Sequence, residues 1–92
     1  MTHIQQLFIQ NLRYYRTQAG LSQLDFSEKI GLSHNYLNAV ENGKNFPSPE
    51  VLQKIADELG ILPYQLFLED PNFQDTSKSD LIQLTRDLRQ KL

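Results

Sequence analysis

The chain contains no cysteine, and this absence excludes disulfide bonds, thiolate metal sites and thiol nucleophiles. Long hydrophobic runs are absent too. The apolar stretch at residues 61–68 is short and interrupted, so we expect no membrane-spanning segment. Residues 1–16 lack a basic region followed by a continuous apolar core, so we expect no secretory signal. These absences favour a cytoplasmic location.

Positive charge is scarce. Nine lysine and arginine residues stand against 11 aspartate and glutamate residues, which gives a net charge of −2. This balance excludes a protein that coats nucleic acid through general basicity, but not a local binding site, because the placement of charge matters more than its total. A length of 92 residues suits one small domain, and 39% hydrophobic content is typical of a folded protein.

The hydrophobic pattern predicts helices only. Apolar residues between residues 3 and 19 recur at spacings of three and four, as in an amphipathic helix. No segment shows the alternation of a strand, so we predict an all-α fold. The other predicted helices cover residues 22–30, 33–41, 48–59 and 63–67.

Serine residues mark three of the predicted helix starts. Ser22 begins a Ser-x-x-acid capping box, Ser33 is expected to cap the third helix, and Ser48 precedes a proline and an acid. Gly20 and Gly43 follow the first and third helices, where a left-handed residue commonly ends a helix. The boundaries are therefore set by local sequence.

The composition changes after Leu68. Residues 69–80 carry a charge of −3 with few apolar residues, and we interpret them as an acidic linker. Residues 81–92 place four leucines along one side of a predicted amphipathic helix. The predicted organisation is thus a domain at residues 1–68, a linker, and a C-terminal helix that is too short to be stable unless packed.

The second and third predicted helices fit together as a helix-turn-helix. Such a pair crosses at about 90–120° through a short turn and needs a small residue at the crossing and a glycine in the turn. Ser27 and Gly31 occupy these places. The apolar residues that would wedge the pair against the other helices are Phe26, Ile30, Leu32, Leu37 and Val40.

Here the sequence resembles the lambda-repressor-like helix-turn-helix family, also called the Cro/C1 or XRE type. The resemblance covers roughly residues 8–67 and is carried by Leu-Ser-Gln, Gly-x-Ser, Glu-Asn-Gly-Lys and Pro-Ser at their family separations. It implies five packed helices and sequence-specific DNA binding, usually by a dimer that regulates transcription. The sequence departs from the family at Ser27, where alanine is common, at Leu24, where a charge is common, and at Phe46, where a basic or polar residue is usual.

The exposed face of the third helix provides the predicted base contacts, which are His34, Asn35, Asn38 and Ala39. Asn35 can donate and accept at once, which suits adenine, and His34 can donate to guanine or to a phosphate. Ala39 would touch a thymine methyl group. The alternative for each is an ordinary solvated or helix-forming residue.

Four residues are predicted to contact the DNA backbone. Gln23 matches the family position that holds the backbone, and Lys44 and Lys29 are candidates for phosphate contacts. Tyr36 could reach a phosphate or a base, or instead cover the helix junction.

Arg16 and Glu41 match a family pair that joins the first helix to the end of the recognition helix. The resemblance implies a partly buried ion pair that orients the recognition helix. The alternative is two independent surface charges.

These features favour a regulator that binds double-stranded DNA as a homodimer on an inverted repeat and acts as a repressor or autoregulator. The C-terminal helix is expected to dock on the partner subunit, with folding back onto its own domain or a frayed tail as the alternatives. A second hypothesis is a protein-interaction module, such as an antitoxin or adaptor. No metal-ligand cluster, catalytic constellation or phosphate-binding glycine loop occurs, so we expect no enzyme, cofactor or metal.

Overall fold

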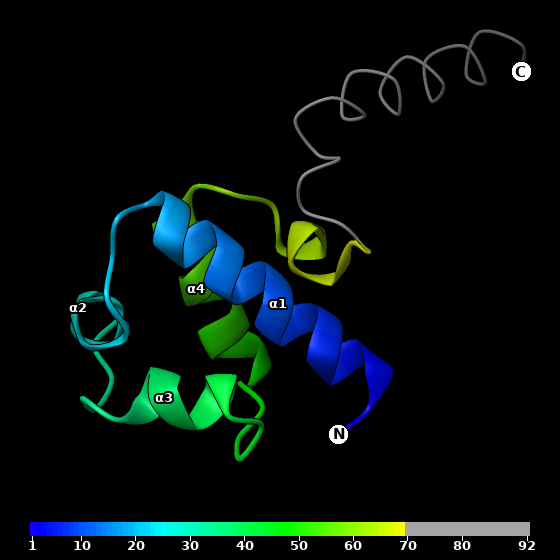
Figure 1. Cartoon of the computed structure of the whole chain (residues 1–92). Helices are drawn as coiled ribbons and strands as arrows, with labels where there is room; N and C mark the ends of the chain where they lie inside the picture. Colours follow the sequence, from blue (N-terminus) through cyan, green and yellow to red (C-terminus); the bar gives the residue numbers. More distant parts are fainter. Residues whose placement is uncertain (70–92) are drawn as a thin grey trace, which may run out of the picture.

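The computed structural model describes residues 1–69, and these form an all-helical unit, as predicted (Figure 1). This unit contains four α-helices and one short 3-10 helix, η1, which lies where the short fifth helix was predicted. Apart from Glu69, the linker predicted at residues 69–80 lies outside the described residues, and so does the helix predicted at residues 81–92. The elements are α1 (His3–Gln18), α2 (Gln23–Lys29), α3 (Tyr36–Glu41), α4 (Pro49–Leu59) and η1 (Pro63–Phe67).

Local capping bonds explain where most helices begin. The Ser22 side chain accepts from the Asp25 amide at 3.0 Å, and the Ser48 side chain accepts from the Val51 amide at 3.3 Å. Each bond satisfies an N–H group that has no partner within its own helix. Both serine caps are therefore present where the sequence places them.

The third helix begins later than the sequence predicts. Ser33 was expected to cap it, but α3 starts at Tyr36, whose amide bonds to the Ser33 carbonyl at 3.0 Å. The N-cap residue, Asn35, makes no side-chain capping bond. Instead, Ser27 of α2 accepts from the Leu37 amide at 3.2 Å. An oxygen from the neighbouring helix thus satisfies the N–H group that a local cap would otherwise serve.

Every helix contributes to one hydrophobic core. Complete burial of a large apolar side chain contributes about 1.5–3 kcal/mol to folding. α1 packs against both α3 and η1, so it holds the helix-turn-helix and the end of the described chain in one unit. The fully buried large apolar residues are Phe8, Leu12, Phe26, Leu37, Ile55 and Leu66.

Phe46, a departure from the family pattern, lies in the loop between α3 and α4 and joins an aromatic cluster. Its ring centroid is 5.1 Å from that of Phe8, and Phe8 is 5.6 Å from Phe67. Such pairs add to the stabilisation from burial alone. The position therefore fastens the loop to α1.

None of the helices within residues 1–69 is both long and apolar enough to cross a membrane.

Candidate nucleic-acid interface

The turn between α2 and α3 positions the candidate surface. Gly31 has φ of +75°, a left-handed conformation that side chains make costly, and it allows the chain to reverse immediately after α2. Leu37 and Val40 are buried on the inner side of α3. Figure 1 shows α3 at the edge of the molecule, so its other side faces solvent.

Three of the four predicted base-contacting residues are exposed on this side. His34 and Asn35 lie in the turn immediately before α3, and Asn38 lies in its first turn. Ala39 is half-buried. His34 Nε2 lies 3.2 Å from Glu28 Oε1, and both side chains are largely exposed, so this contact is one that a ligand can displace at low cost.

The four predicted backbone-contacting residues are not all brought together. Gln23 is half-buried at the start of α2, and Lys44 is exposed in the loop after α3. Tyr36 packs against the core, and burial raises the pKa of its phenol above the ordinary value of 10.0. Lys29 is directed toward α4, where its Nζ lies 3.5 Å from Glu58 Oε1.

Glu41 is the centre of a buried polar cluster at the C-terminal end of α3. Its side chain is completely buried, and the Arg16 side chain is only 11% exposed. Arg16 Nε donates to Glu41 Oε2 at 2.8 Å and Arg16 Nη2 to Oε1 at 3.1 Å, which is a two-pronged contact. Arg16 also donates to the Leu21 carbonyl at 2.8 Å. The pair therefore joins α1, the loop before α2, and α3.

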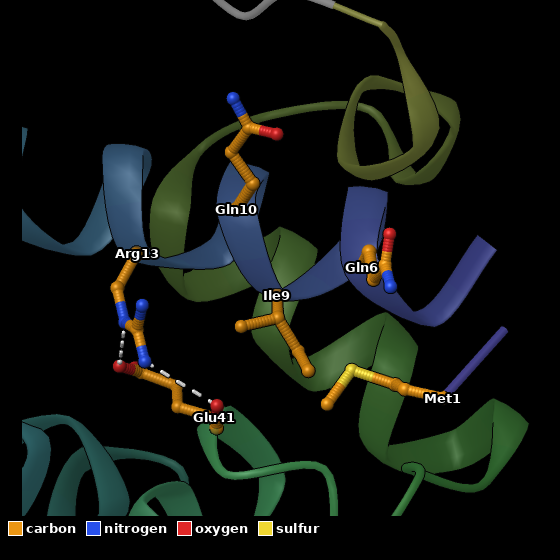
Figure 2. A pocket seen from close by; sticks show the side chains of 6 residues that line it. All are labelled: Met1, Gln6, Ile9, Gln10, Arg13 and Glu41. Carbon is orange, nitrogen blue, oxygen red and sulfur yellow. Dashed lines mark hydrogen bonds and ion pairs between the residues drawn. The ribbon is translucent and has the colours of Figure 1, made fainter. Parts of the chain in front are cut away.

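A second arginine, Arg13, was not anticipated from the sequence. Its Nε donates to Glu41 Oε1 at 3.1 Å and its Nη2 to the Glu41 carbonyl at 3.3 Å (Figure 2). Arg13 lies three residues before Arg16, a spacing that places both on one side of α1. This spacing was the feature of the sequence from which a second arginine beside Glu41 could have been predicted. Because Arg13 is 54% exposed, it is the weaker partner of the carboxylate.

A shallow hollow of about 320 Å³ lies beside this cluster. Figure 2 shows it running from the Arg13–Glu41 contact, past Ile9, to the Met1 side chain. Two polar residues of α1, Gln6 and Gln10, also line it. Within residues 1–69 no three His, Cys, Asp or Glu side chains gather in a way that could hold a metal ion.

The half-buried Gln23 connects the cluster to the exposed surface. Its Nε2 donates to Glu41 Oε1 at 3.0 Å, and its Oε1 accepts from Asn38 Nδ2 at 3.1 Å. Asn42, which is not among the site residues predicted from the sequence, donates from Nδ2 to Asn38 Oδ1 at 3.1 Å. The spacing of Asn38 and Asn42, one helical turn apart, was the available signal.

The α2–turn–α3 unit, with its polar outer side and its anchored C-terminal end, defines a helix-turn-helix protein. A family model described as helix-turn-helix matches residues 12–66, more than half of the chain. The chain belongs to this helix-turn-helix family, of the Cro/C1 (XRE) type, whose members are DNA-binding transcriptional regulators.

Individual relatives agree with this assignment. The chain is 37% identical over 57 residues to an uncharacterised HTH-type transcriptional regulator of Methanocaldococcus jannaschii, covering 62% of this chain and 86% of the relative. A solved structure of a hypothetical transcription factor from Neisseria matches with a TM-score of 0.67 and 31% identity, covering 71% of this chain and 75% of that one. The restriction-modification controller protein C.AhdI of Aeromonas hydrophila matches with a TM-score of 0.62 and 39% identity, covering 66% and 92%.

Proposed function

We propose that this chain binds a specific double-stranded DNA sequence, with α3 entering the major groove. The observation that carries the proposal is the exposed polar surface of His34, Asn35 and Asn38 on the second half of the helix-turn-helix. The major groove admits an α-helix, and neutral hydrogen-bonding side chains match base edges. By occupying an operator in this way, the protein acts as a repressor or autoregulator of transcription.

The exposed residues have distinct proposed roles. Asn35 pairs with an adenine edge through its donor and acceptor together, and His34 donates to guanine or to a phosphate. Ala39, half-buried, faces a thymine methyl group. Lys44 and Gln23 contact phosphates on either side of the recognition helix. For Tyr36, whose ring packs on the core, we propose a phosphate contact through its hydroxyl group.

Two copies are needed for useful affinity. Each phosphate neutralised contributes a slope of about −0.9 in log K against log salt, and one domain offers few exposed basic residues beside α3. We propose a homodimer on two half-sites about 10 bp apart. Leu62 and Tyr64, which are 55% and 53% exposed around η1, supply one apolar surface for self-association. The predicted helix at residues 81–92 is the other candidate.

Selection of bound duplexes from a random-sequence pool, with the full-length protein at moderate salt, tests the proposal. We expect enrichment of an inverted repeat whose half-sites lie about one helical turn apart. Failure to enrich any sequence at low salt, with circular dichroism showing a folded protein, would overturn it. Replacing His34 and Asn35 by alanine should abolish the discrimination between sequences.

A protein-interaction module is the second candidate, favoured by the exposed apolar pair Leu62 and Tyr64. In that case, replacing His34 and Asn35 leaves partner binding intact, whereas charged substitutions at Leu62 and Tyr64 abolish it. The His34 and Asn35 variants therefore separate DNA recognition from protein recognition. Charged substitutions at Leu62 and Tyr64 do not separate them, because they also remove an apolar surface proposed for the dimer that binds DNA.

A further inference from the structure

Three side-chain amides form a continuous hydrogen-bonded row across the helix-turn-helix. We call Gln23, Asn38 and Asn42 the amide row. Asn42 donates to Asn38 at 3.1 Å, Asn38 donates to Gln23 at 3.1 Å, and Gln23 donates to Glu41 at 3.0 Å. The row starts at a completely buried carboxylate and ends on the exposed surface of α3.

Glu41 fixes the direction of this row. An ionised carboxylate can only accept hydrogen bonds, and an arginine can only donate them. Since Arg16 and Arg13 surround Glu41 with donors, the amide that reaches it must also donate, so the Gln23 carbonyl points outward. That carbonyl then requires a donor from Asn38, and the Asn38 carbonyl in turn requires a donor from Asn42. The oxygen and nitrogen of an isolated side-chain amide can exchange places by rotation. Here the orientation of each amide is fixed by the neighbour that lies closer to Glu41 in the row.

The direction of the row limits what Asn38 can offer a ligand. An asparagine has two N–H groups and one carbonyl oxygen. Asn38 gives one N–H to Gln23, and its carbonyl oxygen receives the N–H of Asn42. Its second N–H has no partner in the row, whereas one of the two lone pairs of its carbonyl oxygen is already taken by Asn42. A solitary exposed asparagine can pair with adenine through donor and acceptor together, whereas a donor alone suits any base-edge acceptor.

We propose that Asn38 is held as a hydrogen-bond donor toward a base-edge acceptor, such as guanine N7 or O6 or thymine O4, and that Asn42 is a specificity-determining positioning residue. Asn42 acts by taking one of the two lone pairs of the Asn38 carbonyl and holding that oxygen against itself, which favours donation by Asn38 over acceptance from cytosine N4 or adenine N6. This inference rests on the proposed function, because it concerns how the same surface reads DNA.

The test compares Asn42→Ala with Asn45→Ala, an exposed asparagine in the adjoining loop. Wild type and both variants are put through the random-pool selection, and affinities are measured for all four bases at the position where Asn38→Ala loses discrimination. Asn42→Ala should reduce the preference for acceptor-bearing bases over cytosine by about two- to tenfold, the range that one net hydrogen bond supplies. Asn45→Ala should leave the preference unchanged.

A double variant separates positioning from direct contact. If Asn42 acts through Asn38, Asn42→Ala should have no effect on base preference once Asn38→Ala is present. If Asn42→Ala changes base preference equally with and without the Asn38 side chain, the inference is overturned. It is also overturned if Asn38→Ala lowers affinity by the same factor for every sequence, because a uniform loss of affinity indicates a phosphate contact.

The failures of the two proposals are distinguishable. If wild type selects an operator and Asn42→Ala behaves like Asn45→Ala, this inference fails while the proposed function stands. If folded wild type selects no sequence, both fail.

Discussion

The hydroxyl oxygen of Ser27, on α2, accepts a hydrogen bond at 3.2 Å from the backbone N–H of Leu37, on α3. Ser27 is completely buried. The N-cap residue of α3, Asn35, provides no side-chain bond of its own. Ser27 therefore supplies the missing cap from the neighbouring helix and fixes the two helices of the helix-turn-helix to one another.

Replacing Ser27 by alanine should lower the free energy of unfolding by about 1–3 kcal/mol, because the Leu37 N–H would be buried without a partner. Urea denaturation followed by circular dichroism measures the loss. Ser33→Ala is the matched control, since Ser33 is exposed and is the cap that the sequence predicted. It should change stability by no more than about 0.5 kcal/mol. A larger loss at Ser33 than at Ser27 would contradict this account of the cap.

The two arginines on Glu41 should differ sharply in importance. Arg16→Ala removes a buried partner and should cost about 3–5 kcal/mol, whereas Arg13→Ala removes a half-exposed one and should cost about 0–1 kcal/mol. Chemical denaturation of both variants provides the comparison. A double-mutant cycle between Arg16→Ala and Glu41→Ala should show strong coupling. Additive effects would mean that the pair does not act as a unit.

Contacts between neighbours in sequence could be predicted from local pattern, whereas contacts across the fold could be predicted only where the family resemblance supplied them, as for Arg16 and Glu41. The caps at Ser22 and Ser48 depend on residues three positions away, so the sequence displays them. The cap on α3 joins residues ten positions apart on different helices, and nothing local to Ser33 reveals that it is unused. The resemblance gave Arg16 and Glu41 a shared role, but the burial of that carboxylate follows from packing of three separate segments.

The same distinction applies within the candidate site. His34, Asn35 and Asn38 could be placed on an exposed side of the helix-turn-helix because helical periodicity and the glycine turn determine which side is outward. The direction of Lys29 could not be inferred, because it depends on where α4 brings Glu58.

Stability should depend on pH above 10 through Tyr36. Burial disfavours the ionised phenol, so the pKa of Tyr36 is raised in the folded protein above the 10.0 of an exposed tyrosine. Its contribution to stability is therefore fully present below pH 10 and is lost as the pH rises through the folded-state pKa. Tyr36→Phe should show a shallower decline in the free energy of unfolding over this range. Identical declines in wild type and variant would show that Tyr36 does not titrate in this way.

Replacing Lys44 and replacing Lys29 should have different effects on the salt dependence of operator binding. Lys44 is exposed beside the end of α3, whereas the Lys29 ammonium group lies 3.5 Å from Glu58. A phosphate contact weakens binding equally for all sequences and contributes about 0.9 to the slope of log K against log salt. Lys44→Ala should therefore reduce the magnitude of the slope by about 1 for each half-site without altering base preference.

Lys29→Ala is the control for this measurement, because it removes the same charge from a helix of the same motif. It should change the slope by less than Lys44→Ala does, since the Lys29 ammonium group lies 3.5 Å from a carboxylate of α4. Fluorescence anisotropy with the selected operator, repeated at several salt concentrations, gives both slopes. If the Lys29 variant lost slope and the Lys44 variant did not, the DNA backbone would have to pass along the α2–α4 side of the domain. The proposed placement of α3 in the groove would then be wrong.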